Sequence, residues 1–122
     1  MKRVYISCPI TLGDGSYNFF QACRAQEILM RSGYACLNPA LSMMHPNAKN
    51  ILHGMWLASD LPFVEICDLI VRLPGESIGA DMECDHARKH GIPIWLTSIP
   101  ALEAQLVARR NGVDPSQRGT AV

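Results

Sequence analysis

The residues best suited to chemistry lie in one short segment, PGESIGADMECDHARKHG, at residues 74–91. There an apolar strand pattern ends in a Pro-Gly turn, and a helix pattern opens with Ser77 and Gly79 and carries Glu83 about one turn in. Free backbone N–H groups at such a helix start, together with a serine hydroxyl, form a binding site for an anion such as phosphate. We expect the helix dipole to keep the nearby Glu83 carboxylate ionised.

Each candidate residue also has an ordinary structural explanation. Ser77 is a good N-cap, and Glu83 taken alone is an exposed helix glutamate. Asp60 and Asp68 flank the start of an apolar run and fit helix-end or turn positions. Tyr5, in a strand pattern, is expected in the core with its hydroxyl bonded to some partner. The residue types alone leave both explanations open.

Two weaker patterns suggest other chemistry. His86 and His90 have the i, i+4 spacing of zinc-binding histidines. The glutamate of an HExxH motif is absent between them, so a third ligand would be Glu83 or come from elsewhere. Cys8 beside Pro9 is a candidate nucleophile, but no base is tied to it by spacing. Our interpretation includes neither a metal nor a cysteine nucleophile, although the residues alone leave both open.

The elements that must position these residues follow from hydrophobic periodicity and turn signals. Strands are predicted at 2–7, 34–39, 68–73 and 91–96, and helices at 16–32, 55–67, 79–90 and 100–111. For the first helix we expect Ser16 as N-cap. Its predicted apolar stripe consists of Phe19, Phe20, Cys23, Ile28 and Leu29. We expect residues 40–53 to form a mobile loop or a short helix over a site, and Pro62 to break or kink the second helix.

This alternation predicts an α/β fold, a flavodoxin/Rossmann-like three-layer sandwich around a mainly parallel sheet. Ligands of such folds bind beyond the carboxyl ends of the strands. Those ends are the loops around 7–15, 38–50 and 74–79, and the first of them offers three candidate binding residues: Cys8, Ile10 and Thr11. We expect one domain at 1–112 and a polar tail at 113–122.

Composition excludes several classes of protein. The chain has 122 residues, 48% of them hydrophobic, and its net charge is zero, which argues against binding of a nucleic-acid backbone. No apolar run approaches the ~18 residues of a membrane span, and the N-terminus lacks the pattern of a signal peptide. The five cysteines include no C-x-x-C pair, which is typical of buried free thiols in a reducing, cytoplasmic compartment.

Two segments together resemble one known family. The opening VYISCPIT is similar to the Y-[IL]-[SA]-G-P-I/M opening of nucleoside 2-deoxyribosyltransferase-like proteins. The segment SDLPFVEICDLIVRLPGESIGADMECDHA resembles their second half, where a [SD]-x-G-x-x-x-E motif carries the catalytic glutamate. The resemblance spans roughly residues 3–96. With its W-x-x-x-D-L and L-P-G motifs, the chain is most similar to the short bacterial and phage branch.

The resemblance implies an enzyme that cleaves the N-glycosidic bond of a 2′-deoxynucleoside or its 5′-monophosphate, by hydrolysis or by transfer of the sugar to another base. By matching positions, Glu83 would be the nucleophile, Tyr5 would position it or the sugar, and Asp60 would act near the leaving base. Ser77 occupies a position where the deoxynucleotide N-hydrolases have serine and the nucleoside transferases aspartate. Because serine at a helix N-terminus favours phosphate and aspartate repels it, we expect a 5′-monophosphate substrate, with Thr11 facing the same anion.

The family's glycine after the first strand is Cys8 here, which reshapes the expected sugar pocket. The alternative interpretation is therefore a nucleotide-binding module that keeps the anion site at Ser77 and Gly79 but lacks catalysis. The resemblance also implies a homodimer or larger homo-oligomer, with small-molecule substrates as partners. It implies no metal or organic cofactor.

Overall fold

The computed structural model describes residues 2–110 of the chain. Strands and helices alternate along it, with two short 3-10 helices before the second α-helix. The elements are β1 (Arg3–Ser7), α1 (Gly15–Arg31), β2 (Ala35–Leu37), η1 (Pro39–Met44), η2 (Ala48–Asn50), α2 (His53–Glu65), β3 (Leu69–Arg72), α3 (Ile78–Lys89), β4 (Ile94–Leu96) and α4 (Ile99–Arg110). The expected tail at 113–122 lies outside the described residues.

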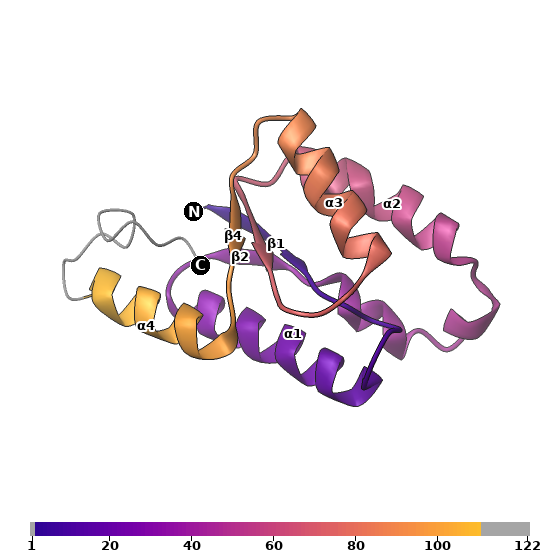
Figure 1. Cartoon of the computed structure of the whole chain (residues 1–122), viewed down its shortest axis with the longest axis horizontal. Helices are drawn as coiled ribbons and strands as arrows, with labels where there is room; N and C mark the ends of the chain where they lie inside the picture. The colour runs from indigo at the N-terminus through magenta and orange to yellow at the C-terminus, as the bar shows by residue number, and fades with distance from the viewer. Residues whose placement is uncertain (1, 111–122) are drawn as a thin grey trace.

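The four strands form one parallel sheet in the order β2-β1-β3-β4. Helices α1 and α4 cover one face of this sheet, and α2 and α3 cover the other (Figure 1). This confirms the predicted α/β three-layer fold. Because the chain leaves β1 toward one face and β3 toward the other, their carboxyl ends form the crevice where such folds bind ligands.

Alternation along β1 sends its side chains to two different layers. Val4 and Ile6 pack in the larger core cluster, which also contains buried residues of α1 and α4. Tyr5 packs on the opposite face with Ile70 of β3 and with residues of α2 and α3. Ser7 is two residues beyond Tyr5 and therefore shares that second face. One five-residue strand thus builds the main core and also sends two hydroxyl groups toward α3.

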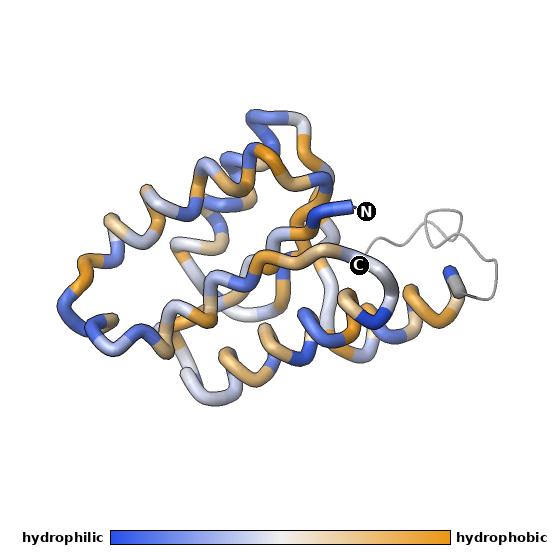
Figure 2. Tube along the Cα trace, turned by 180° about the vertical axis from the view of Figure 1, so that it is seen from behind, coloured by the Kyte–Doolittle hydropathy of each residue, from blue (hydrophilic) through white to orange (hydrophobic). Residues whose placement is uncertain are grey.

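The distribution of hydropathy follows these layers. Hydrophobic residues concentrate on the central strands, whereas hydrophilic and hydrophobic residues alternate along the surrounding helices (Figure 2). In α2, however, only Val64 is fully buried, although the helix is rich in apolar residues. Among residues 2–110, no helix is both long and apolar enough to cross a bilayer.

The first helix differs from its prediction at both the cap and the buried face. Asp14, not Ser16, is the N-cap, and its carboxylate accepts from the backbone N–H of Tyr17 at 3.1 Å. Phe20, expected in the apolar stripe, is 61% exposed. Ile28 and Leu29 are buried as predicted and Phe19 packs against the core, and the fully buried Ala22 and Ala25 complete the inner face of the helix. At 3.6 residues per turn, Phe20 falls opposite the arc of α1 that is buried, so its side chain lies on the outer side.

Residues 40–53 and Pro62 also differ in part from their predictions. The segment that was expected to be a mobile loop or a short helix forms η1, η2 and the connections around them. Helix α2 begins at His53, two residues earlier than predicted, and continues through Pro62 to Glu65. A proline here removes one N–H from the helix ladder, but the assigned helix remains a single element.

Candidate active site

Glu83 of α3 is buried and bonded to two hydroxyl groups of β1. Only 7% of the residue is exposed. Ser7 Oγ donates to Oε1 at 2.8 Å, and the Tyr5 hydroxyl donates to Oε2. Each carboxylate oxygen keeps a further lone pair. The carboxylate is therefore held in one orientation by two donors from a rigid strand and still has a lone pair available for chemistry.

The electrostatics of Glu83 differ from the sequence-based expectation. Burial raises its pKa from the ordinary 4.5 to about 7; the hydrogen bonds from Tyr5 and Ser7 oppose this rise, and the charge of Asp60 adds to it. Burial thus opposes the effect expected of the helix dipole, because loss of hydration favours the neutral carboxyl. At neutral pH the carboxyl is poised between its two protonation states.

Tyr5 acts here as a hydrogen-bond donor. Burial, and then the negative charge of Glu83, raise the pKa of Tyr5 far above its ordinary range, so the phenol keeps its proton. Ser7 is the corresponding donor that the sequence did not single out as a site residue. The signal was nevertheless present, because Tyr5 and Ser7 are two apart on one strand and must share a face.

Asp60 approaches the same site from α2. Its side chain is partly buried and lines the pocket described below. Burial raises its pKa from 3.8 to about 6. Because the charge of Asp60 also raises the pKa of Glu83, the two carboxyl groups lie within electrostatic reach of each other. Asp60 is thus a pocket residue, and the helix-end explanation for it was wrong.

A pocket of about 340 Å³ opens above Glu83, within the size range of small-molecule sites. Its lining comes from the three loops that the sequence predicted to converge, and also from one side of α2. The lining residues are Cys8, Ile10, Thr11, Pro39, Ser42, Met43, Ala48, Lys49, Ile51, His53, Trp56, Leu57, Asp60, Ser77, Gly79, Ala80 and Glu83. All the predicted site residues therefore line this pocket except Tyr5, which lies behind Glu83 and contacts its carboxylate.

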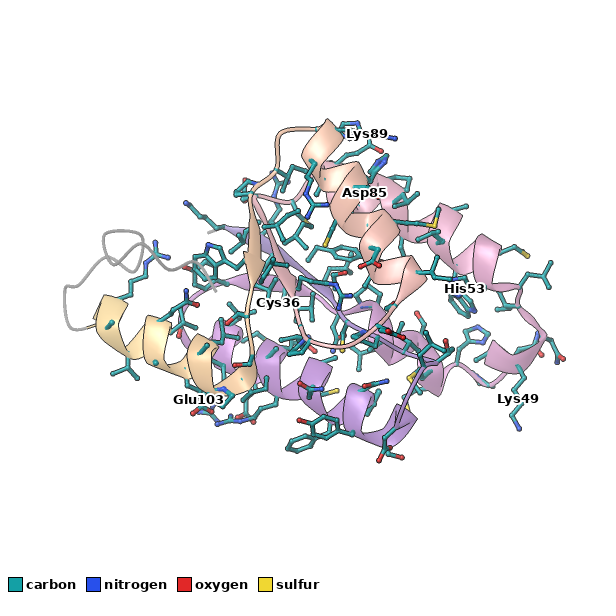
Figure 3. All side chains as sticks on the ribbon, viewed as in Figure 1. Cys36, Lys49, His53, Asp85, Lys89 and Glu103 are labelled. Atoms are coloured by element: carbon teal, nitrogen blue, oxygen red, sulfur yellow. The ribbon has the colours of Figure 1, made fainter. Side chains whose placement is uncertain are left out.

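The start of α3 forms the polar end of the pocket. Ser77 is the N-cap, and its Oγ accepts from the Ala80 N–H at 3.0 Å, which leaves the hydroxyl proton free to donate to a ligand. A Cβ added to Gly79 would lie 3.3 Å from the imidazole of His53, so the glycine allows that ring to lie close to the helix start. His53 extends from the start of α2 and Lys49 from η2 (Figure 3). The sequence analysis missed both basic residues because their segment has no clear periodicity.

The loop between β3 and α3 is held by Arg72 and shaped by Gly75. The Arg72 guanidinium donates to the carbonyl of Gly75 at 2.8 Å and contacts Asp81 Oδ1 at 3.2 Å. Gly75 has φ +119°, and a Cβ there would lie 2.8 Å from Cγ of Pro9. The glycine of the L-P-G motif is therefore required both by its backbone conformation and by the contact with Pro9.

Cys8 lines the pocket as a thiol. Burial raises its pKa to about 11, and Sγ lies 3.5 Å from the carbonyl oxygen of Asn18. The thiolate form needed of a nucleophile is therefore disfavoured. No non-glycine residue between 2 and 110 has a positive φ, so the backbone conformation at Cys8 does not require glycine.

The two histidines of α3 lie away from this pocket. His86 and His90 group with Glu65 of α2, and Glu83, which the sequence offered as their third ligand, is not part of that group. Glu83 is instead bonded to β1. The two sets of residues are therefore spatially separate sites on the same pair of helices.

Comparison with known proteins identifies a family for most of the chain. No curated protein matches the chain. A family model described as a domain of unknown function (DUF4406) matches residues 2–96, which run from the start of the sheet to the end of β4 and include every residue of the site above. The chain belongs to this DUF4406 domain family.

Proposed function

We propose that this protein cleaves the N-glycosidic bond of a 2′-deoxynucleoside 5′-monophosphate, by hydrolysis or by transfer of the deoxyribosyl group. The observation that carries the proposal is the buried Glu83 carboxylate, held by Tyr5 and Ser7 and adjoining a pocket that also contains Asp60. A carboxylate with both oxygens oriented and a second carboxyl group nearby is the equipment of a retaining glycosidase.

The chemistry would proceed in two displacements. An oxygen of ionised Glu83 attacks the anomeric carbon, the bond from that carbon to the base nitrogen breaks, and the base leaves with the bonding electrons and takes up a proton. Asp60, with its pKa raised to about 6, supplies or relays that proton. Water or a second base then attacks the same carbon and gives a proton back to Asp60, and the ester bond to Glu83 breaks to restore the carboxylate.

The lining of the pocket supports a substrate with an aromatic ring and an anionic group. The ring would lie among the apolar lining residues, which include Ile10, Met43, Ile51, Trp56 and Leu57. The 5′-phosphate would lie at the start of α3, where the Ser77 hydroxyl and the first backbone N–H groups of the helix are available. Thr11, Lys49 and His53 line the same pocket and would add donors to the phosphate.

The deciding experiment is a base-release assay. The chain is incubated with each common deoxynucleoside and its 5′-monophosphate, and free base is measured by chromatography. At least one monophosphate should release base. Glu83→Gln and Glu83→Ala should lower turnover by several orders of magnitude while substrate still binds, because the nucleophile is lost but the pocket remains.

A binding module without catalysis would give a different result. It would bind a monophosphate in calorimetry but release no base with any substrate. If the native chain does release base, near-normal turnover of Glu83→Ala would remove Glu83 from the mechanism. Lys89→Ala is a suitable control, since Lys89 is exposed at the far end of α3 and does not line the pocket (Figure 3).

The proposal extends to a homodimer or larger homo-oligomer in the cytoplasm. Exposed large apolar side chains on and beside α2 and α3 support the oligomer. They are Met55, Phe63, Ile66, Ile78 and Met82. Supporting the reducing compartment are the five cysteines, all free. Light scattering in solution tests the oligomeric state, and a monomer at micromolar concentration would refute the oligomer.

A further inference from the structure

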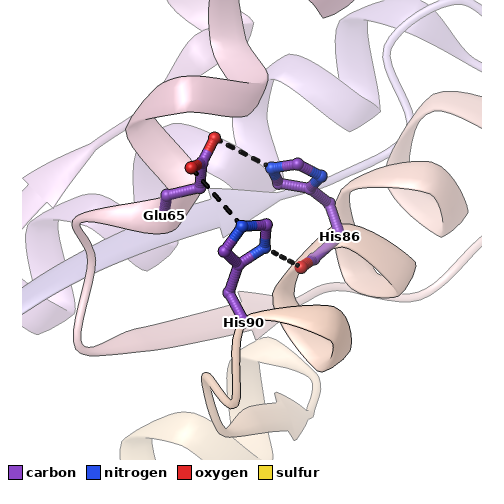
Figure 4. A group of neighbouring side chains, drawn as sticks. All are labelled: Glu65, His86 and His90. Carbon is purple, nitrogen blue, oxygen red and sulfur yellow. Dashed lines mark hydrogen bonds and ion pairs between the residues drawn. The ribbon is translucent and has the colours of Figure 1, made fainter.

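The far ends of α2 and α3 carry a second cluster of side chains, separate from the pocket. Glu65 ends α2, His86 lies in the last turn of α3, and His90 is the C-cap of α3. Nε2 of His86 lies 3.1 Å from Oε2 of Glu65, and Nε2 of His90 lies 3.4 Å from Oε1 (Figure 4). The three ligand atoms all lie within 4.8 Å of one another.

These separations are close to those around a zinc ion. Zinc binds imidazole nitrogen and carboxylate oxygen at about 2.0–2.2 Å, so ligand atoms at the corners of a tetrahedron lie roughly 3.4 Å apart. The two Glu65–histidine distances, 3.1 and 3.4 Å, are near this value. Two histidines and one carboxylate also form a donor set that zinc uses in proteins, with a fourth position left for water.

The hydrogen bonding of His90 directs its Nε2 at the Glu65 carboxylate. Its Nδ1 lies 2.9 Å from the carbonyl oxygen of His86. A carbonyl only accepts, so Nδ1 carries the proton, and in neutral His90 the lone pair is on Nε2. That lone pair then faces a carboxylate oxygen of Glu65 at 3.4 Å. A metal ion between Nε2 and the carboxylate would be bound by both groups.

The same hydrogen bond is the outer-shell support that metal-binding histidines need. An Nδ1–H bonded to a backbone carbonyl sets the tautomer and the orientation of the ring, so that Nε2 points at the metal. Nε2 of His86 lies 3.1 Å from Oε2 of Glu65, a distance at which an Nε2–H donates to the carboxylate. When an ion binds, it takes the place of that proton, and the neutral ring carries its proton on Nδ1.

We propose that Glu65, His86 and His90 form a zinc site that clamps the C-terminal end of α2 to the end of α3. The cluster is partly exposed, so an ion and its water reach it from solvent. The negative end of the α3 dipole adds to the attraction for a cation. Asp60 lies five residues before Glu65, and Glu83 lies three before His86, so the clamp holds together the two helices that carry the pocket carboxylates.

The test is a zinc titration of the full chain after treatment with a chelator. Calorimetry should show one zinc ion bound per chain, and the Tm should rise with free zinc because the ion binds the folded state. Zinc binding should be weakened by each of three substitutions, His86→Ala, His90→Ala and Glu65→Ala. Loss of an outer-shell partner alone weakens metal binding by about 10- to 100-fold, and loss of a ligand should cost more. His45→Ala and Lys89→Ala, outside the cluster, should bind as the native chain does.

A second measurement on the native chain avoids dependence on the folding of variants. Co²⁺ in the site should give ligand-field absorption typical of nitrogen and oxygen ligands without the charge-transfer band of a thiolate, which separates this cluster from the five cysteines. Absence of stoichiometric zinc, zinc uptake that survives His86→Ala, or a thiolate band would each overturn the proposal. Because activity is not the readout, the result is independent of the proposed glycosidase chemistry.

Discussion

The Tyr5 hydroxyl of β1 donates a hydrogen bond to Oε2 of Glu83 on α3, across 78 residues of sequence. Ser7, two residues along the same strand, donates to the other oxygen. Both donors stabilise the ionised carboxylate, whereas burial and the charge of Asp60 favour the protonated form. The protonation state of Glu83 near neutral pH is therefore set by opposing effects from neighbouring elements.

The first prediction separates these opposing effects. Asp60→Asn should lower the pKa of Glu83, because it removes a nearby negative charge. Tyr5→Phe and Ser7→Ala should each raise it, because each removes a donor to the charged form. The measurement is a carbon NMR titration of the side-chain carboxyl groups, in which the Glu83 signal is assigned by its loss in Glu83→Gln. Shifts in the same direction for Asp60→Asn and Tyr5→Phe would contradict this account of the site.

The second prediction concerns stability and pH. A Glu83 pKa of about 7 in the folded chain, against an ordinary 4.5, means that the folded state favours the protonated carboxyl. The contribution of Glu83 to the free energy of unfolding is therefore fully present below about pH 4.5 and is lost as the pH rises through about 7. At about 1.36 kcal/mol per pH unit, the loss is roughly 3 kcal/mol.

Glu83→Gln isolates that contribution, because its neutral amide resembles the protonated carboxyl in size. Urea unfolding of both proteins at pH 5 and pH 8 should show the variant becoming more stable than the native chain as the pH rises. An unchanged difference between the two proteins at the two pH values would show that Glu83 titrates normally.

The third prediction concerns the anion end of the pocket. If Ser77 and the start of α3 bind a 5′-phosphate, kcat/KM should favour the monophosphate over its nucleoside. A hydrogen bond to a charged group contributes roughly 1.5–3 kcal/mol, or about one to two powers of ten. Ser77→Ala should weaken the preference and Ser77→Asp should reverse it, because aspartate caps the helix equally well but repels phosphate. A native chain that prefers the nucleoside would rule out the phosphate site.

The fourth prediction compares two glycines. Gly75→Ala places a Cβ 2.8 Å from Cγ of Pro9 at φ +119°, and should destabilise the fold by about 1–3 kcal/mol. Gly54→Ala, in α2, meets no atom within 4 Å and should be neutral or stabilising by up to about 1 kcal/mol. Denaturant unfolding of both variants measures the difference. Equal stability of the two would show that the β3–α3 loop adapts to the added methyl group.

Local patterns in the sequence were enough to predict the fold and the location of the site. Periodicity distinguishes strands from helices, and their alternation implies a parallel sheet whose carboxyl ends meet. Ser77 was recognisable as a cap, and the structure has it in that role. The predictions that were wrong concern particular faces and ends. Phe20 lies opposite the buried arc of α1, and Asp14 caps that helix two residues before the serine that the sequence favoured, because its carboxylate reaches the N–H of Tyr17.

Tertiary structure alone decided which side chains meet and how their charges behave. No spacing in the sequence links Glu83 to Tyr5 and Ser7, or Glu65 to His86 and His90, because each set joins elements that come together only through the sheet or the α2–α3 contact. The pKa of Glu83 likewise depends on tertiary structure. A helix dipole is a local property that the sequence reveals, whereas loss of hydration depends on every element packed around the carboxyl group, and here that loss is the largest cause of the raised pKa.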